Sequence, residues 1–156
     1  MERIQPQSSS RPAALPIAGL GSAHREPVPT RSMPLVLIAD DERDIVDFLS
    51  ILLKDEGFRV VGAYDGEQAW RLVKTERPAL VISDVSMPRL TGVELVHRLR
   101  LAKNGLEKLP VILMSALDTD VPHPVAPIIA KPFDLDHMLS LVSSELTPSR
   151  QQRGVA

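Results

Sequence analysis

Five short apolar runs alternate with longer amphipathic segments across the middle of the chain. The runs cover residues 35–39, 59–64, 79–83, 111–114 and 128–130. Each is rich in Val, Ile, Leu or Ala and has the length of a buried strand. Four of the segments beside these runs carry apolar residues at spacings of three and four, which predicts helices beginning near residues 43, 66, 92 and 135. The third of these helices is predicted to run from about Gly92 to Lys103. Alternating strands and helices predict a parallel sheet with helices on both faces.

Local capping signals support these helix boundaries. Thr91 and Glu94 have the spacing of a capping box, in which a hydroxyl and a carboxylate satisfy free N–H groups at the start of a helix. Asp134 is placed to cap the last helix, and Gly57 is placed to end the first one in a left-handed conformation.

Polar side chains stand where the apolar runs end. Asp40 and Asp41 follow the first run, Asp84 the third, Ser115 the fourth and Lys131 the fifth. Because ligands bind beyond the carboxyl ends of the strands in such sheets, we expect these side chains to share one small site.

Three carboxylates in one site need a counter-charge. Two unit charges ~4 Å apart repel by ~4 kcal/mol at an effective dielectric constant near 20. Lys131 compensates for one charge at most, so the sequence predicts a divalent cation, and an all-oxygen ligand set suits Mg²⁺.

The connection from residue 116 to residue 130 is short and rich in proline. Pro122, Pro124 and Pro127 fall within it, and an interior proline costs a helix ~3 kcal/mol. The helix expected at this place in an alternating fold is therefore predicted to be shortened or missing.

The composition of the chain excludes several classes of function. Residues 33–147 carry 12 Lys and Arg against 18 Asp and Glu, so this segment lacks the basic face that nucleic-acid binding requires. The chain contains no cysteine, which excludes disulfides and cysteine catalysis, and no apolar run approaches the ~18 residues of a membrane helix.

The two ends of the chain have no apolar periodicity. Residues 1–32 and 148–156 are predicted to be disordered, with one folded domain over residues 33–147. A mildly apolar stretch over residues 13–20 is interrupted by Pro16 and preceded by Glu2, so we do not interpret it as a signal peptide. Translation starting at Met33 is an alternative reading of the leader.

The strand-end residues, taken in order, resemble a family of bacterial signalling domains. The matching motifs are Asp40-Asp41, Asp84 with Met87-Pro88 and Gly92, Ser115-Ala116, and Lys131-Pro132-Phe133. Together they resemble the receiver domain of two-component response regulators, of the single-domain, chemotaxis-regulator type. The resemblance implies a doubly wound, five-stranded parallel sheet in the flavodoxin-like order 2-1-3-4-5, and a cytoplasmic protein.

The same resemblance implies how the metal would be held. Asp41, Asp84 and the backbone carbonyl of Ser86 would contact Mg²⁺ directly, and Asp40 would act through water.

It also implies a phosphoacceptor rather than an enzyme in the ordinary sense. Asp84 would take a phosphoryl group from a phosphohistidine on a sensor kinase or phosphotransfer protein, while Lys131 and Ser115 contact the phosphoryl oxygens. Catalysis would be limited to its own phosphotransfer and dephosphorylation. The domain would signal by contact with an unidentified downstream protein. No DNA-binding domain and no membrane are expected to take part.

Two other functions are considered. Family members often have an aromatic residue three positions before the lysine, where this chain has Ile128, so a protein-binding module that does not depend on phosphate is the main alternative. A magnesium-dependent phosphohydrolase is a weaker one, because such enzymes usually place a second aspartate where this chain has Ser86.

Overall fold

A computed structural model describes residues 33–116 and 125–147. The strands are β1 (Leu35–Ala39), β2 (Arg59–Ala63), β3 (Leu80–Asp84), β4 (Val111–Ala116) and β5 (Ile128–Lys131). The helices are α1 (Arg43–Asp55), α2 (Gly66–Glu76), α3 (Gly92–Arg100), the short 3-10 helix η1 (Leu106–Lys108) and α4 (Leu135–Leu146). The predicted disordered segments, residues 1–32 and 148–156, lie outside the described residues.

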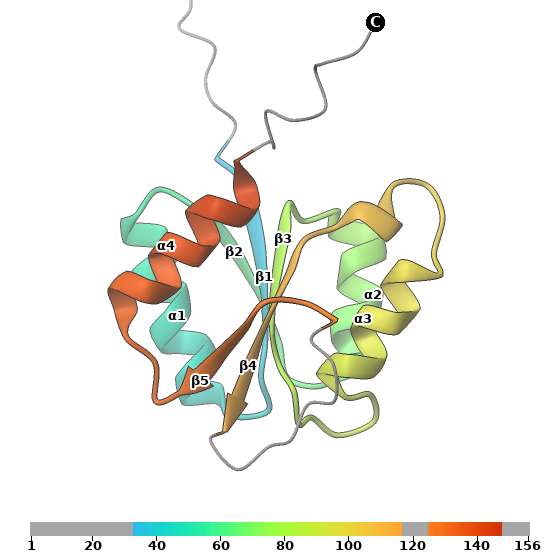
Figure 1. The fold of residues 1–156 in the computed structure, drawn as a ribbon, viewed down its shortest axis with the longest axis horizontal. Coiled ribbons are helices and arrows are strands. Elements are labelled where there is room, and N and C mark those ends of the chain that lie inside the picture. Colours follow the sequence, from blue (N-terminus) through green and yellow to red (C-terminus); the bar gives the residue numbers. More distant parts are fainter. Residues whose placement is uncertain (1–32, 117–124, 148–156) are drawn as a thin grey trace, which may run out of the picture. The chain divides into compact units, whose positions relative to one another are not determined.

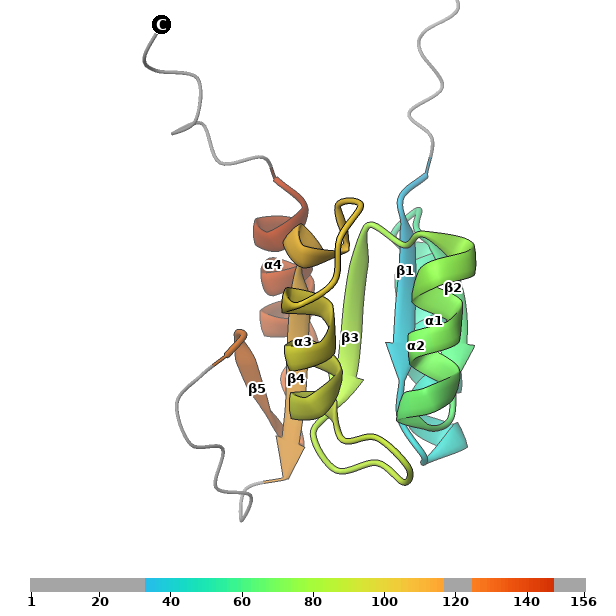
Figure 2. The ribbon, with the colours of Figure 1, turned by 90° about the vertical axis from the view of Figure 1, so that its right-hand side faces the viewer.

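The five strands form one parallel sheet in the order β2-β1-β3-β4-β5, as predicted. Helices α1 and α4 cover one face of the sheet, and α2 and α3 cover the other (Figure 1). Viewed from the side of α2 and α3, the strand arrowheads all point to the same edge (Figure 2). Residues that end different strands are therefore neighbours in space.

The apolar core has two layers because both faces of each central strand are covered. Leu37 and Leu113 pack on the α2–α3 side, and Ile38 and Ile112 pack on the α1–α4 side. All four side chains are fully buried. Continuous apolar runs, rather than alternating ones, are typical of parallel strands buried on both faces.

The predicted caps are present. The Thr91 side chain accepts a hydrogen bond from the Glu94 backbone N–H, and Glu94 accepts one from the Thr91 backbone N–H, which completes the capping box. Asp134 accepts hydrogen bonds from two backbone N–H groups at the start of α4. Gly57, just past α1, has a φ of 90°, a conformation that glycine adopts without steric cost.

The connection between β4 and β5 was predicted to lack a full helix. Its described part, residues 125–127, is not helical, and residues 117–124 lie outside the described residues. The four α-helices of the described residues all lie elsewhere in the chain. Helix α3 also ends earlier than predicted, at Arg100 instead of Lys103, because the chain then turns through Asn104 and Gly105, both at positive φ.

Candidate metal and phosphoryl site

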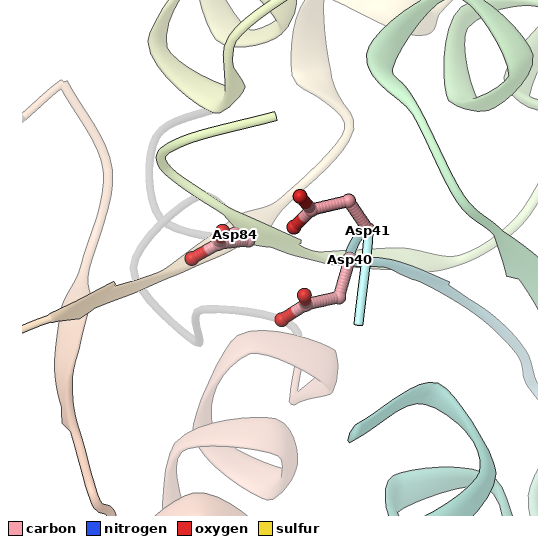
Figure 3. A group of neighbouring side chains, drawn as sticks. All are labelled: Asp40, Asp41 and Asp84. Atoms are coloured by element: carbon pink, nitrogen blue, oxygen red, sulfur yellow. The ribbon is translucent and has the colours of Figure 1, made fainter. Parts of the chain in front are cut away.

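Three carboxylates meet at the ends of β1 and β3. Asp40 is 0% exposed and Asp84 is 7% exposed, whereas Asp41 is open to solvent. One oxygen from each lies within 4.8 Å of the others, and Figure 3 shows the three side chains at the strand ends. The strand register explains the meeting, because β1 and β3 are adjacent and parallel, with Ala39 opposite Ser83.

Lys131, at the end of β5, extends its ammonium group into this cluster. Its Nζ lies 2.7 Å from Asp40 Oδ2 and 3.2 Å from Asp84 Oδ1. The Lys131 side chain is 17% exposed, and the cluster is open to solvent at Asp41. The peptide bond between Lys131 and Pro132 is cis.

Close backbone packing fixes the position of Asp84. A Cβ atom at Gly92 would lie 2.2 Å from the carbonyl oxygen of Asp84, so only glycine fits at the start of α3. The Gly92 N–H donates to the carbonyl of Val85 at 2.8 Å, and the Ser83 hydroxyl donates to the carbonyl of Asp84 at 3.0 Å. The residues on both sides of Asp84 are thus held by short-range contacts.

The electrostatics of the site reflect an excess of negative charge. Burial raises the pKa of the Asp84 carboxyl above its usual value of 3.8, and the charge of Asp40 raises it further, against the opposing effect of Lys131. Burial alone would lower the pKa of Lys131, but the hydrogen bond to Asp40 and the charges of Asp40 and Asp84 raise it above 10.5. Both shifts indicate that added positive charge would stabilise this region.

The two serines are placed differently. Ser115 lies near the end of β4 and is 4% exposed. Its hydroxyl donates a hydrogen bond to the backbone carbonyl of the next residue, Ala116, at 3.0 Å. Ser86 is exposed in the loop after β3, two residues beyond Asp84. The structure therefore brings Asp40, Asp41, Asp84 and Lys131 together, with both serines on adjoining strand ends or loops.

The donor set fits Mg²⁺. Three carboxylate oxygens within 4.8 Å of one another, partly open to solvent, suit a small cation that keeps several water ligands. The buried charge is only partly compensated by Lys131, which gives a physical reason for binding a cation there. Asp40, Asp41 and Asp84 are the side chains that would hold it.

Some residues near the site were not predicted. Glu42 Oε1 lies 4.0 Å from Lys131 Nζ, and the Glu42 N–H donates to Asp40 Oδ1 at 2.9 Å. A pocket beside Lys131 is lined by Ile45, Phe48 and Phe133 among others. The only sequence signal for Glu42 is its place directly after Asp40 and Asp41.

Comparison with known proteins decides the family. The family model described as "Response regulator receiver domain" matches residues 36–143, more than half of the chain. The chain belongs to the response regulator receiver family. Receiver domains of this family are phosphoacceptor modules of two-component systems, and they generally bind Mg²⁺ at an acidic pocket.

Individual relatives of this receiver domain are also response regulators or transcriptional regulatory proteins. The chain is 44% identical over 85 residues to the response regulator GtcR of Aneurinibacillus migulanus, covering 54% of this chain and 34% of that protein. A similar match to the transcriptional regulatory protein PhoP of Bacillus subtilis has 36% identity and also covers 34% of that relative. The match thus spans about a third of the length of these curated relatives.

Solved structures show the same fold. A response regulator receiver protein from Pseudomonas putida has 33% identity and a TM-score of 0.65, covering 72% of this chain and 98% of that one. Chemotaxis response regulator CheY4 of Vibrio cholerae has 29% identity and a TM-score of 0.64, covering 74% and 100%. Within the described residues, no helix is long and apolar enough to cross a membrane.

Proposed function

We propose that this receiver domain accepts a phosphoryl group on Asp84 in a Mg²⁺-dependent reaction with a phosphohistidine donor protein. The observation that carries this proposal is the position of Asp84. It ends the central strand β3, nearly buried, with Lys131 at 3.2 Å and the carboxylates of Asp40 and Asp41 beside it. The domain would extend over residues 33–147.

In the transfer step, a carboxylate oxygen of Asp84 attacks the phosphorus atom. A P–O bond forms, the P–N bond to the donor imidazole breaks, and the imidazole nitrogen keeps the electron pair and takes a proton from water. The reaction leaves an acyl phosphate on Asp84. Later hydrolysis of this acyl phosphate is the only further reaction expected of the domain.

Bound Mg²⁺ would neutralise charge on the phosphoryl oxygens. We assign its binding to Asp40, Asp41, Asp84 and the Ser86 carbonyl, in line with the fit of the three carboxylates. Asp40 would act through water.

Two further residues would contact the transferred group. Lys131 Nζ, already 3.2 Å from Asp84 Oδ1, would neutralise charge on a phosphoryl oxygen. Ser115 would first give up its hydrogen bond to the carbonyl of Ala116 and then donate to a phosphoryl oxygen. A rotation of one hydroxyl would thus report the state of the site.

The donor would be a sensor histidine kinase or a histidine phosphotransfer protein. A donor has to bring its imidazole to Asp84, and the pocket that includes Lys131 and Phe48 lies beside that path. Phe48 and Ile51 of α1 are exposed large apolar side chains and offer contact area to a protein partner. We further propose that the receiver acts alone in the cytoplasm and signals by contact with a downstream protein.

Intact-mass spectrometry with acetyl phosphate and Mg²⁺ tests the acceptor. Wild type is expected to gain one phosphoryl group, and omission of Mg²⁺ should suppress the gain. Asp84→Asn keeps the size of the side chain but removes the nucleophile, so it should gain none. Equal phosphorylation of wild type and Asp84→Asn would contradict the proposal.

The alternative is a binding module whose contacts do not depend on phosphate. It is favoured by Ile128, which stands where the family often has an aromatic residue and which is only partly buried. Affinity for a captured partner should then be the same before and after full phosphorylation. A change in affinity on phosphorylation supports a switch instead.

A further inference from the structure

The loop that follows Asp84 rests on the turn between β2 and α2. Its Leu90 is 5% exposed and belongs to the apolar core on the α2–α3 side. The Gly66 N–H donates to the carbonyl of Pro88 at 3.5 Å. The loop is thus supported from outside, by residues about twenty positions earlier in the chain.

Gly66 makes this contact close. A Cβ atom at that position would lie 1.9 Å from the carbonyl oxygen of Leu90, a separation that no side chain tolerates. The first residue of α2 and the end of the loop therefore touch through their backbones. A shift of the turn would be passed directly to the loop.

One ion pair joins the two segments at the surface. Arg89 Nη1 donates to Asp65 Oδ2 at 2.9 Å, with the side chains 67% and 16% exposed. The other oxygen of Asp65 accepts from the Gln68 N–H at 2.7 Å as the N-cap of α2. Asp65 is thereby fixed to the helix and offers a rigid partner to Arg89.

The backbone of Arg89 is unusual. Its φ is 70°, in the left-handed region that residues other than Gly, Asn and Asp seldom adopt. Such a conformation persists only where the surroundings hold it in place. The contacts to Asp65 and the packing of Leu90 provide that support.

We propose that the Arg89–Asp65 pair positions the Ser86 carbonyl for Mg²⁺. This inference rests on the proposed function, in which that carbonyl is a metal ligand. Mg²⁺ requires nearly ideal octahedral geometry, so a small displacement of one ligand weakens binding. Arg89 and Asp65 are positioning residues, because they act on the metal only through the loop.

Magnesium titration of the full chain by calorimetry tests this proposal. Arg89→Met keeps the length of the side chain and removes the charge, and Asp65→Asn keeps an oxygen to cap α2. Each variant is expected to weaken Mg²⁺ binding roughly 3- to 10-fold, below the 10- to 100-fold typical of residues directly behind a metal ligand. The double variant should be no weaker than either single one, because both remove the same contact.

The direction of the change in Mg²⁺ affinity in each variant distinguishes a positioning role from a direct effect of the lost charge. Loss of the positive charge of Arg89 alone would tighten Mg²⁺ binding, whereas loss of the negative charge of Asp65 alone would weaken it. Weaker Mg²⁺ binding in both variants therefore supports a positioning role for the Arg89–Asp65 pair. Tighter or unchanged binding in Arg89→Met, with wild type binding normally, would overturn the proposal.

A matched control and a second readout complete the test. Arg98→Met breaks a different ion pair, that of Arg98 in α3 with Glu67 in α2 at 3.1 Å. Neither residue belongs to the loop after Asp84, so this variant should not weaken Mg²⁺ binding. Lower melting temperatures in Arg89→Met and Asp65→Asn with unchanged Mg²⁺ affinity would indicate a merely structural pair and overturn the proposal. No Mg²⁺ binding by wild type would overturn both this inference and the proposed function.

Discussion

Two regions of this receiver domain concentrate charged side chains, and they differ in burial. At the strand-end site, Lys131 lies 2.7 Å from Asp40, and the two side chains are 17% and 0% exposed. On the α2–α3 surface, defined here as Glu67, Trp70, Lys74 and Arg98, the ion pair of Arg98 with Glu67 is 40% and 36% exposed. Similar distances therefore occur in very different surroundings.

The difference shows which charges the fold cannot leave unbalanced. On the α2–α3 surface, Arg98 and Lys74 also lie 5.5 Å and 5.1 Å from the Trp70 ring, and water screens every charge. At the strand ends, Asp40 and Asp84 are almost out of water, with one ammonium between them. Only the strand-end site gains a large benefit from an added cation.

The largest effect is expected for Lys131→Met, which leaves buried Asp40 without its ion-pair partner. Removal of one partner of a buried pair should lower the free energy of unfolding by about 3 kcal/mol. Urea unfolding followed by circular dichroism measures this loss, without Mg²⁺. If Lys131→Met and Arg98→Met lowered the free energy of unfolding by similar amounts, burial would not distinguish the strand-end site from the α2–α3 surface.

The next effect concerns the backbone beneath Asp84. Gly92→Ala would place a methyl group against the Asp84 carbonyl oxygen, at 2.2 Å before relaxation. Because the two nearest atoms are backbone atoms of Asp84, we expect a loss of about 2 kcal/mol in the same unfolding experiment. Gly105→Ala is the control, since a Cβ there would meet nothing within 4 Å, although its φ of 89° adds a smaller backbone cost. Equal losses for the two variants would show that the contact with Asp84 is unimportant.

A smaller effect of opposite sign is expected for Asp84→Asn without Mg²⁺. Because burial and Asp40 raise the pKa of Asp84, its ionised form destabilises the folded state at neutral pH. The neutral amide should raise the melting temperature by roughly 2 to 5 °C. The difference should vanish as the pH falls through the raised pKa toward 3.8, since wild type then becomes neutral as well. A melting temperature below that of wild type at pH 7 would contradict this interpretation.

The smallest effect is expected for Arg98→Met on the α2–α3 surface. An exposed ion pair contributes about 1 kcal/mol or less, and the Trp70 contact adds little because it is also partly solvated. The variant should unfold near the wild-type urea midpoint and accept phosphate normally. A loss as large as that of Lys131→Met would mean that exposure does not determine the worth of these pairs.

Much of the fold follows from local signals. The helix starts at Thr91 and Asp134 agree with the structure, because capping chemistry acts over a few residues. The strand order also agrees, but the family resemblance implied it and local periodicity did not. The early end of α3 was not predicted, although Asn104-Gly105 is a turn signal. There, a local turn overrides apolar spacing, and Leu106 packs into the core from a separate 3-10 turn.

The site was predictable only as far as strand ends determine it. That Asp40, Asp84 and Lys131 meet follows from the parallel register of their strands. The direction of the Ser115 hydroxyl is set by a side-chain rotation within β4, and the contact of Arg89 with Asp65 depends on loop conformations fixed by tertiary packing. No spacing in the sequence relates Arg89 to a residue 24 positions earlier.

The most direct test of the central claim is to locate the phosphoryl group after reaction with acetyl phosphate and Mg²⁺. Reduction of the acyl phosphate with borohydride, followed by peptide mass spectrometry, marks the modified carboxylate. We expect modification at Asp84 alone and loss of the mark when Mg²⁺ is removed. A mark at Asp41 or at another carboxylate, or one that does not depend on Mg²⁺, would contradict the account.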